Sequence, residues 1–232
     1  TYGKLFGTKF ATSLDEVRTH KDIKPGQTAE DVFTINNYGY VVRKDRVGTT
    51  EEAHMYVLDE KGNNKKVYLG NMNPDFNMNM TNTLTWKNLT FYFTMSWQQG
   101  GLLFNNTKMY MSFAGRNAKL WDQSEKPWVQ RKSYNYTNQH PTESFMEEAT
   151  FLKMREMALN YRFTRNQLAS IGLDFLKGIK VGVIGRNLFT LTNFSGPDPE
   201  TRTIEGGVLN GIETPKYPSD IRTVTGTISI DF

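Results

Sequence analysis

Apolar and polar side chains alternate along the stretch 76–97 of this chain. The even positions from Phe76 to Trp86 are mostly apolar, and after Lys87-Asn88 the phase changes, so that the odd positions from Leu89 to Trp97 are apolar. A period of two is typical of a β-strand with one apolar face, and two such strands around a two-residue turn predict a hairpin. An eleven-residue strand tilted by about 45° covers roughly 25 Å, the height of the lipid-facing band of an outer-membrane barrel. A soluble sandwich shows the same alternation, but the strand length and the aromatic side chains at the strand ends favour the barrel.

Four other segments carry strand patterns. They are Thr1–Thr12, Thr150–Phe163, Ile179–Leu191 and Val224–Phe232. With the hairpin they give about six membrane-type strands, and the predicted class is therefore all-β. Two short helices are also expected, one within 105–120 and one after the capping-box sequence that begins at Thr164.

The connections between these strands alternate in length. Short ones are expected at 87–88 and 164–178, and long, polar, irregular ones at 13–74, 98–149 and 192–220. Bacterial barrels have short periplasmic turns and long outer loops, so the long segments are predicted to lie outside the cell. Six strands cannot close a barrel, because even small barrels have about eight. The sheet must then be completed by protein outside this sequence.

Composition agrees with a barrel and excludes several other classes. Apolar residues make up 38% of the 232 residues, mean hydropathy is −0.57, and no apolar run approaches the roughly 18 residues of a spanning helix. A barrel needs no such run, because only alternate strand residues meet lipid. Cysteine is absent, which excludes disulfides and thiolate metal sites. The net charge of +4 is spread along the chain, so no nucleic-acid groove is indicated.

The sequence offers only weak candidates for catalytic or metal-binding residues. His20, His54 and His140 lie far apart in predicted loops, and we interpret them as surface histidines rather than metal ligands or catalytic groups. The segment Asp59–Asn64 has alternate oxygen side chains around a glycine, as calcium loops have, but three lysines lie in it and after it and a bidentate acid is missing. A tight turn is therefore expected there, with no metal, and the chain is not expected to be an enzyme.

Aromatic side chains gather in the long predicted loops. Our candidates for contact with a substrate or a lid protein are Trp121, Trp128, Tyr134, Tyr136 and Phe194. Aromatic rings in loops stack on sugars or peptides. The alternative is that they pack the loops against their neighbours.

Three motifs resemble one family. They are Gly70–Phe76 (GNMNPDF) with Thr81–Thr83, Ala149–Arg155 (ATFLKMR), and Gly185–Thr192 (GRNLFTLT) with Asp198-Pro199-Glu200. In this order they resemble segments of the SusC/RagA-type TonB-dependent outer-membrane transporters. Within the motifs, the positions taken from the resemblance are Asn73, Pro74, Asp75, Phe76, Asn187, Leu188 and Phe189.

The resemblance implies that residues 1–232 are the C-terminal part of one 22-stranded antiparallel barrel domain with long extracellular loops. The plug domain and the earlier strands would lie outside this sequence. It implies a multi-pass protein of the bacterial outer membrane that imports oligosaccharides or peptides, with TonB acting through the missing N-terminal part and a SusD-type lipoprotein as lid. Phe232 would be the insertion signal for barrel assembly.

The resemblance adds no cofactor, because the Asp/Asn/Gly-rich loop of many members is largely lost at 58–63. Two alternatives remain: a non-transporting barrel such as an adhesin or secretion pore, and a soluble sugar-binding β-sandwich.

Overall fold

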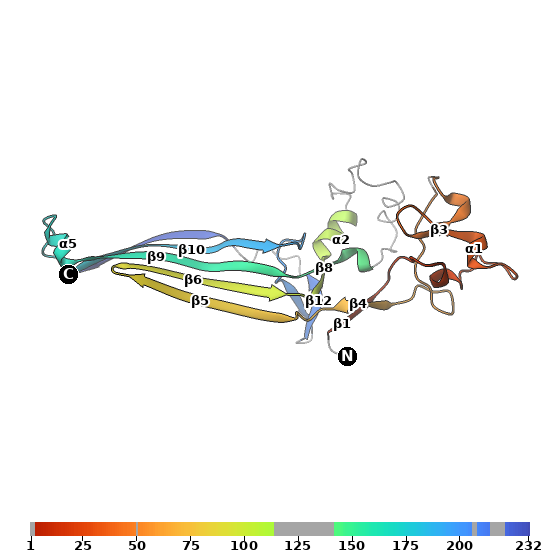
Figure 1. Ribbon diagram of the computed structural model, residues 1–232, viewed down its shortest axis with the longest axis horizontal. Helices are drawn as coiled ribbons and strands as arrows, with labels where there is room; N and C mark the ends of the chain where they lie inside the picture. Colours follow the sequence, from red (N-terminus) through yellow and green to blue (C-terminus); the bar gives the residue numbers. More distant parts are fainter. Residues whose placement is uncertain (1–2, 50, 114–141, 206–207, 214–220) are drawn as a thin grey trace.

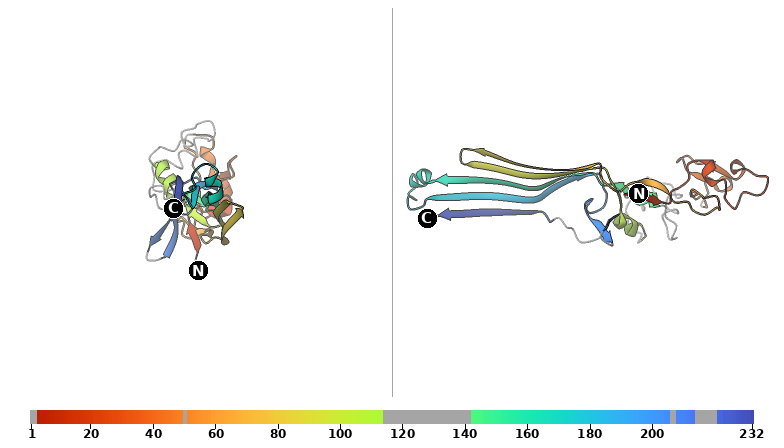
Figure 2. Two further views of the ribbon diagram at one scale, coloured as in Figure 1. Left: turned by 90° about the vertical axis from the view of Figure 1, so that its left-hand side faces the viewer. Right: turned by 90° about the horizontal axis from the view of Figure 1, so that it is seen from below.

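The main feature of the structure is one long five-stranded antiparallel sheet. The computed structural model describes residues 3–49, 51–113, 142–205, 208–213 and 221–232. The sheet has the strand order β13-β10-β9-β6-β5. Its strands are β5 (Phe76–Trp86), β6 (Leu89–Gln99), β9 (Phe151–Thr164), β10 (Gly178–Thr192) and β13 (Thr223–Asp231). Figure 2 shows them side by side along the length of the molecule.

The predicted hairpin is confirmed. β5 and β6 pair without a break from Phe76–Gln99 to Trp86–Leu89, and the turn residue Lys87 has a φ of 53°. The other short connection holds α5 (Arg165–Ala169), where Thr164 and Gln167 form the expected capping box. Both short connections lie at one end of the sheet and the long ones at the other, as Figure 1 shows.

Cross-strand pairing sorts the side chains onto two faces. Leu84 pairs with Phe91, and Phe91 pairs with Leu159. The row continues through Val183 to Gly226. Because successive residues of a strand point to opposite faces, the apolar rows of all five strands share one face and the polar rows share the other.

A β-bulge changes the phase of β9 at Arg155. Thr94 pairs with Glu156 but the next residue of β6, Met95, pairs with Met154, which leaves Arg155 as the extra residue. Unbroken alternation from Phe163 would put Lys153 on the apolar face. The bulge instead pairs Lys153 with Ser96 on the polar face.

The prediction of a membrane-type strand at Thr1–Thr12 was wrong. Its described part contributes only β1 (Lys4–Gly7), which pairs with β4 (Val67–Asn71) in a separate two-stranded sheet. The glycines Gly3 and Gly7 interrupt the aromatic pattern there. The long sheet of the described residues therefore has five of the expected strands.

Residues 8–67 form a small packed unit rather than an irregular excursion. It contains η1 (Leu14–Val17), α1 (Ala29–Val32), β2 (Phe33–Ile35), β3 (Val41–Arg43) and η2 (Lys44–Arg46). Phe33, Val17 and Val41 are fully buried in its core. The apolar residues of this segment are too widely spaced to show a period, so the core was not visible in the pattern.

The second and third long connections meet in a small four-stranded sheet. Its order is β11-β12-β7-β8, formed by β7 (Leu102–Phe104), β8 (Met146–Glu148), β11 (Arg202–Glu205) and β12 (Val208–Glu213). The expected helix is α2 (Asn106–Phe113), and η3 (Thr142–Phe145) precedes β8. No helix among the described residues is long and apolar enough to cross a membrane.

His54 lies in the interior of the N-terminal unit, so its interpretation as a surface histidine was wrong. Its ring stacks on Tyr40 at 4.4 Å and meets Phe10 edge-on at 5.0 Å, and it is 5% exposed. Nε2 is buried without a hydrogen-bond partner. Burial lowers the pKa of His54 from 6.5 to about 4, against a weaker opposing effect of Glu52.

We therefore expect the unit 8–67 to lose stability as the pH falls from about 6.5 to about 4, because the unfolded chain binds a proton there that the folded unit excludes. Well above pH 6.5 His54 is neutral in both states and contributes no pH dependence. The loss is at most about 3 kcal/mol. Amide exchange of residues 8–67 at a series of pH values, corrected for intrinsic rates, measures it. His54→Phe should flatten the dependence, and an unchanged pH profile in this variant would contradict the assignment.

Candidate functional site: the polar face and its rim

Uncharged polar side chains cover the polar face along three of the five strands. On β5, β6 and β13 they are Asn77, Asn79, Thr81, Thr83, Thr85, Thr90, Tyr92, Thr94, Ser96, Gln98, Thr223, Thr225, Thr227 and Ser229. Charges lie mainly on β9 and β10, and several form pairs: Arg186 Nε donates to Glu156 Oε2 at 2.8 Å, and Arg162 Nη2 lies 3.5 Å from Asp231 Oδ2. The face can therefore hydrogen-bond a polar solute or protein segment with little net charge.

A segment of the third long connection, residues 193–201, folds back onto the end of β9; we call it the rim segment. Its first anchor is apolar. Phe194 is 5% exposed and packs with Leu103 and Ala149. Gly196 allows this packing, because a Cβ there would lie 2.4 Å from the Phe194 ring. The prediction that Phe194 contacts substrate or lid is thus corrected, since its ring faces the interior.

The second anchor is a hydrogen-bonded carboxylate. Ser195 donates through its backbone N to Glu147 Oε2 at 2.7 Å and through Oγ to Glu147 Oε1 at 2.8 Å. Lys108 Nζ also donates to Glu147, at 2.7 Å. Burial acts to raise the pKa of Glu147, but the hydrogen bonds from Lys108 and Ser195 outweigh it and hold the pKa below its ordinary value.

The third anchor is a buried ion-pair cluster. Lys153 Nζ donates to Asp198 Oδ1 at 2.8 Å and to Glu200 Oε2 at 2.6 Å. Arg155 bonds Glu200 and also donates to Ser96 Oγ at 3.1 Å. The Lys153 side chain is 3% exposed. Burial acts to raise the pKa of Glu200, yet the hydrogen bonds from Arg155 and Lys153 lower it on balance.

This cluster explains why two of the motifs occur in the same chain. The cations belong to Ala149–Arg155, and the acids belong to Asp198-Pro199-Glu200. Each charge offsets the other, so removing one partner of the pair costs stability. Both motifs were identified in the sequence, but their contact was not predicted. Their opposite charges were the feature that could have indicated this contact.

The first motif forms the corner between β4 and β5. The backbone N of Asp75 donates to the carbonyl of Gln99 at 2.8 Å, and Phe76 meets the Trp97 ring edge-on at 4.9 Å. Asn73 donates through its backbone N to Asn71 Oδ1. Gly100 has a φ of 73°, and a Cβ there would lie 2.5 Å from an Asp75 carboxylate oxygen. These residues fix how the chain enters the long sheet.

The third motif contains an irregularity of β10. Asn187 has a φ of 51°, a left-handed conformation that asparagine tolerates better than most residues. The pairing of β10 with β9 shifts between Arg186 and Phe189. Leu188 lies beside Gly185, where a Cβ would be 2.7 Å from a Leu188 methyl carbon. The motif therefore supplies the bend that brings β10 to the rim segment.

The Asp59 loop is a tight turn, as expected. Asp59 Oδ1 accepts the backbone N–H groups of Lys61 at 2.9 Å and Asn63 at 2.8 Å. These hydrogen bonds hold the pKa of Asp59 below its usual value. The carboxylate is occupied by its own turn, and the expectation of no calcium here stays a prediction.

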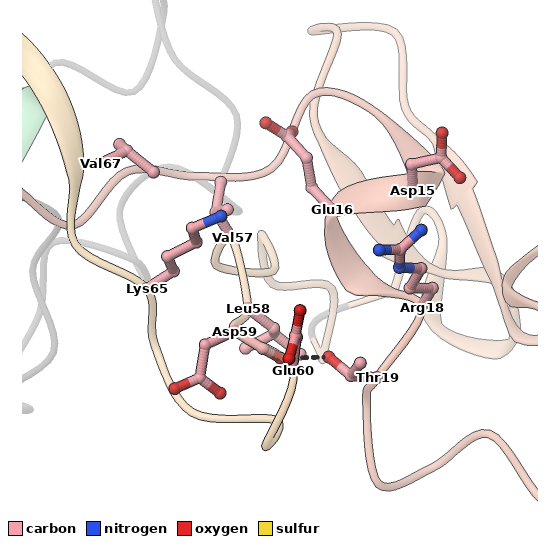
Figure 3. A pocket seen from close by; sticks show the side chains of 10 residues that line it. All are labelled: Asp15, Glu16, Arg18, Thr19, Val57, Leu58, Asp59, Glu60, Lys65 and Val67. Atoms are coloured by element: carbon pink, nitrogen blue, oxygen red, sulfur yellow. Dashed lines mark hydrogen bonds between the residues drawn. The ribbon is translucent and has the colours of Figure 1, made fainter.

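A pocket of about 310 Å³ lies beside this turn, inside the N-terminal unit (Figure 3). Thr19 Oγ1 donates to the carbonyl of Asp59 at its floor, at 2.7 Å. Glu16 Oε2 accepts hydrogen bonds from the backbone N–H groups of Thr12 and Ser13. The pocket lies away from the polar face, and two of its four acidic groups, Glu16 and Asp59, already serve a cap and a turn.

The structure does not test the predicted roles of four loop aromatic residues or of the C-terminal phenylalanine. Trp121, Trp128, Tyr134 and Tyr136 lie outside the described residues. Phe232 is 75% exposed after β13. Its role as an insertion signal stays a prediction.

Curated proteins and solved structures are similar to this chain. TonB-dependent receptor P26 of Formosa agariphila is 25% identical over 179 residues, which is 72% of this chain and 18% of that receptor. TonB-dependent receptor P3 of the same organism is 22% identical over 180 residues, 71% of this chain and 17% of that receptor. No family model matches.

The solved neighbours are structures of the RagAB peptide importer. Its closed-closed state matches with a TM-score of 0.57 at 16% identity, over 100% of this chain and 23% of that chain. Its open-open state matches with a TM-score of 0.54 at 18% identity, over 78% of this chain and 20% of that chain. The chain resembles part of a SusC/RagA-type TonB-dependent transporter. It spans about a fifth of the length of the receptors it matches.

In such a SusC/RagA-like segment we expect Lys153→Met to release the rim segment, because the buried Asp198 would lose its ion pair with Lys153. The expected loss of local stability is about 3 kcal/mol. Arg186→Met is the matched control: it removes a cation of the same face whose side chain is 60% exposed, so the loss should be under about 1 kcal/mol. Amide exchange of residues 193–201 measures both, and equal protection in the two variants would contradict the anchoring role.

Proposed function

We propose that this chain forms part of the wall of an outer-membrane β-barrel that imports oligosaccharides or peptides, driven through TonB and covered by a SusD-type surface lipoprotein. The carrying observation is a single-layer sheet whose apolar face is open and whose other face is polar. The proposed protein moves its substrate and does no chemistry on it.

The apolar face supports contact with lipid. Leu84, Val183 and Ile228, from three different strands, are 58%, 52% and 72% exposed. Each buried Å² of apolar surface stabilises by about 25 cal/mol, so a whole face left in water is a large unrealised stabilisation. Soluble proteins rarely expose such a continuous apolar surface. Hydrocarbon covers it without a second protein layer.

The edges of the sheet support a closed barrel. Among the described residues β5 and β13 pair on one side only. Each then presents a row of unpaired N–H and C=O groups at its outer edge, and such edges do not occur in hydrocarbon. Further strands of the same protein would pair these edges, and the 22-stranded barrel of the family is the proposed result.

The soluble β-sandwich is the less favoured alternative. A sandwich buries the apolar face of one sheet against a second sheet about 10 Å away. In the part of the chain that the structure describes, the small sheet β11-β12-β7-β8 lies beyond the end of the strands, as Figure 1 shows, and does not cover that face. The TonB-dependent receptors and the RagAB importer also favour import over a non-transporting adhesin or secretion pore.

The polar face and the rim segment would line the path of the substrate. Hydroxyl and amide groups suit both sugars and peptide backbones as hydrogen-bond partners. RagAB is described as a peptide importer. For this chain both substrate classes are kept.

The proposal is tested with the full-length protein in its own host. Membrane fractionation should find it in the outer membrane, and affinity purification in detergent should recover a surface lipoprotein with it. Growth on the substrate should require both the protein and TonB. Full-length protein that stays folded and monomeric in buffer without detergent would overturn the barrel, and TonB-independent growth would overturn the energised importer.

The facing of β6 gives a quantitative prediction. Phe93→Arg should cost roughly 2 to 4 kcal/mol in lipid, because Phe93 lies in the apolar row near the middle of its strand. Thr83→Arg, on the polar row of neighbouring β5, should cost little. Unfolding of the protein in liposomes by denaturant measures both. Equal costs would refute the assignment of the two faces.

A further inference from the structure

The connector between β9 and β10, residues 165–177, exposes two large apolar side chains beyond the ends of the strands. Ile171 is 68% exposed and Phe175 is 65% exposed. Leu168 and Leu176 of the same connector are 2% and 5% exposed. The connector therefore packs through two leucines and still presents Ile171 and Phe175 outward.

The connector adjoins the apolar face. Gln167 Nε2 donates to the Tyr161 hydroxyl at 3.0 Å, and Tyr161 belongs to the apolar row of β9. Asn88 Nδ2, from the hairpin turn, donates to Gln167 Oε1 at 3.1 Å. α5 thus joins the hairpin turn and the end of the apolar row, at the end of the sheet shown in Figure 1.

The apolar side chains nearest the ends of the strands form a band next to the connector. Trp86 is 70% exposed, Phe163 37% and Ile230 47%, and pairing places all three in the final apolar rows at this end. Ile171 and Phe175 extend this band past the strand ends. Large apolar and aromatic side chains at such a level are typical of the boundary between hydrocarbon and lipid headgroups.

Basic residues occur in the connector and in the hairpin turn at this end of the sheet. The connector contains Arg165 and Lys177 against a single acid, Asp174, and Lys87 lies over the Trp86 ring at 5.3 Å. The described part of the chain offers no ion-pair partner for Arg165 or Lys177. Cations near a membrane surface bind anionic headgroups, while their aliphatic stems cover apolar surface.

We infer that the connector is a membrane-interface foot that binds an anionic glycerophospholipid. Ile171 and Phe175 enter the boundary of the acyl chains, and Arg165 and Lys177 contact the lipid phosphate, with Lys87 of the hairpin turn at the same end of the sheet. The inference rests on the proposed membrane barrel. It adds a lipid contact made by a turn that has no part in the barrel wall.

Depth measurements in liposomes test the apolar part. The chain has no cysteine, so Ile171→Cys and Phe175→Cys in full-length protein, with any other cysteines replaced, each carry one bimane label. We expect quenching by nitroxide at the headgroup and weak quenching by aqueous iodide. Asp174→Cys is the matched control in the same connector and should show the opposite preference.

A label at Val183→Cys separates this inference from the proposed function. Val183 lies in the middle of an apolar row and should be quenched by nitroxide deep in the acyl chains. If Val183 is quenched while Ile171 and Phe175 respond to iodide alone, the foot is overturned and the barrel stands. That result would indicate a surface for a soluble periplasmic protein. If none of the labels responds to lipid nitroxide, the membrane proposal itself fails.

A lipid titration tests the headgroup chemistry. In mixed micelles, phosphatidylglycerol should shift the bimane emission at position 171, and phosphatidylcholine should not. Arg165→Gln and Lys177→Gln should each raise the half-maximal phosphatidylglycerol concentration about fivefold. Lys180→Gln, on the polar face of β10, is the matched control and should have no effect. Equal responses of the three variants would overturn phosphate recognition by the connector.

Discussion

In the proposed barrel, the backbone of each strand must find its hydrogen bonds in neighbouring strands, and this constraint governs the long sheet. β6, β9 and β10 meet it on both sides, whereas β5 and β13 meet it on one side among the described residues. The strands can be long because their pairing is nearly continuous. Side chains are then free to differ between the two faces, of which the apolar one would meet lipid and the polar one the interior of the proposed barrel.

Irregularities in the pairing occur where the wall meets the long connections. The bulge at Arg155 places Lys153 on the polar face. The register of β10 against β9 shifts at the corresponding level, where Asn187 adopts a left-handed conformation. Lys153 then binds Asp198 and Glu200 of the rim segment. One buried cation thus couples strand register to the position of a loop, and three independent anchors hold that loop at the end of the sheet.

The alternation of apolar and polar residues was sufficient to predict the strands of the long sheet, but it was insufficient to predict the rest of the structure. The five strands, the turn at Lys87 and the capped helix after Thr164 follow from local alternation and capping. The pairing of Lys153 with Asp198 joins residues 45 positions apart, and local pattern carries no information about it. The core around Phe33 and the burial of His54 and Phe194 likewise depend on distant contacts. The family resemblance marked the right segments of the rim without revealing how they touch.

The central claim is that one face of β9 meets lipid and the other meets water, with a change of phase at Arg155. A nitroxide scan of residues 151–164 in liposomes, comparing collision with oxygen and with a water-soluble nickel complex, tests it most directly. The account predicts oxygen-accessible labels at odd positions from 157 to 163 and, after the change of phase, at Leu152, and nickel-accessible labels at even positions from 156 to 162. An unbroken odd-even alternation through Arg155, or no alternation at all, would contradict it.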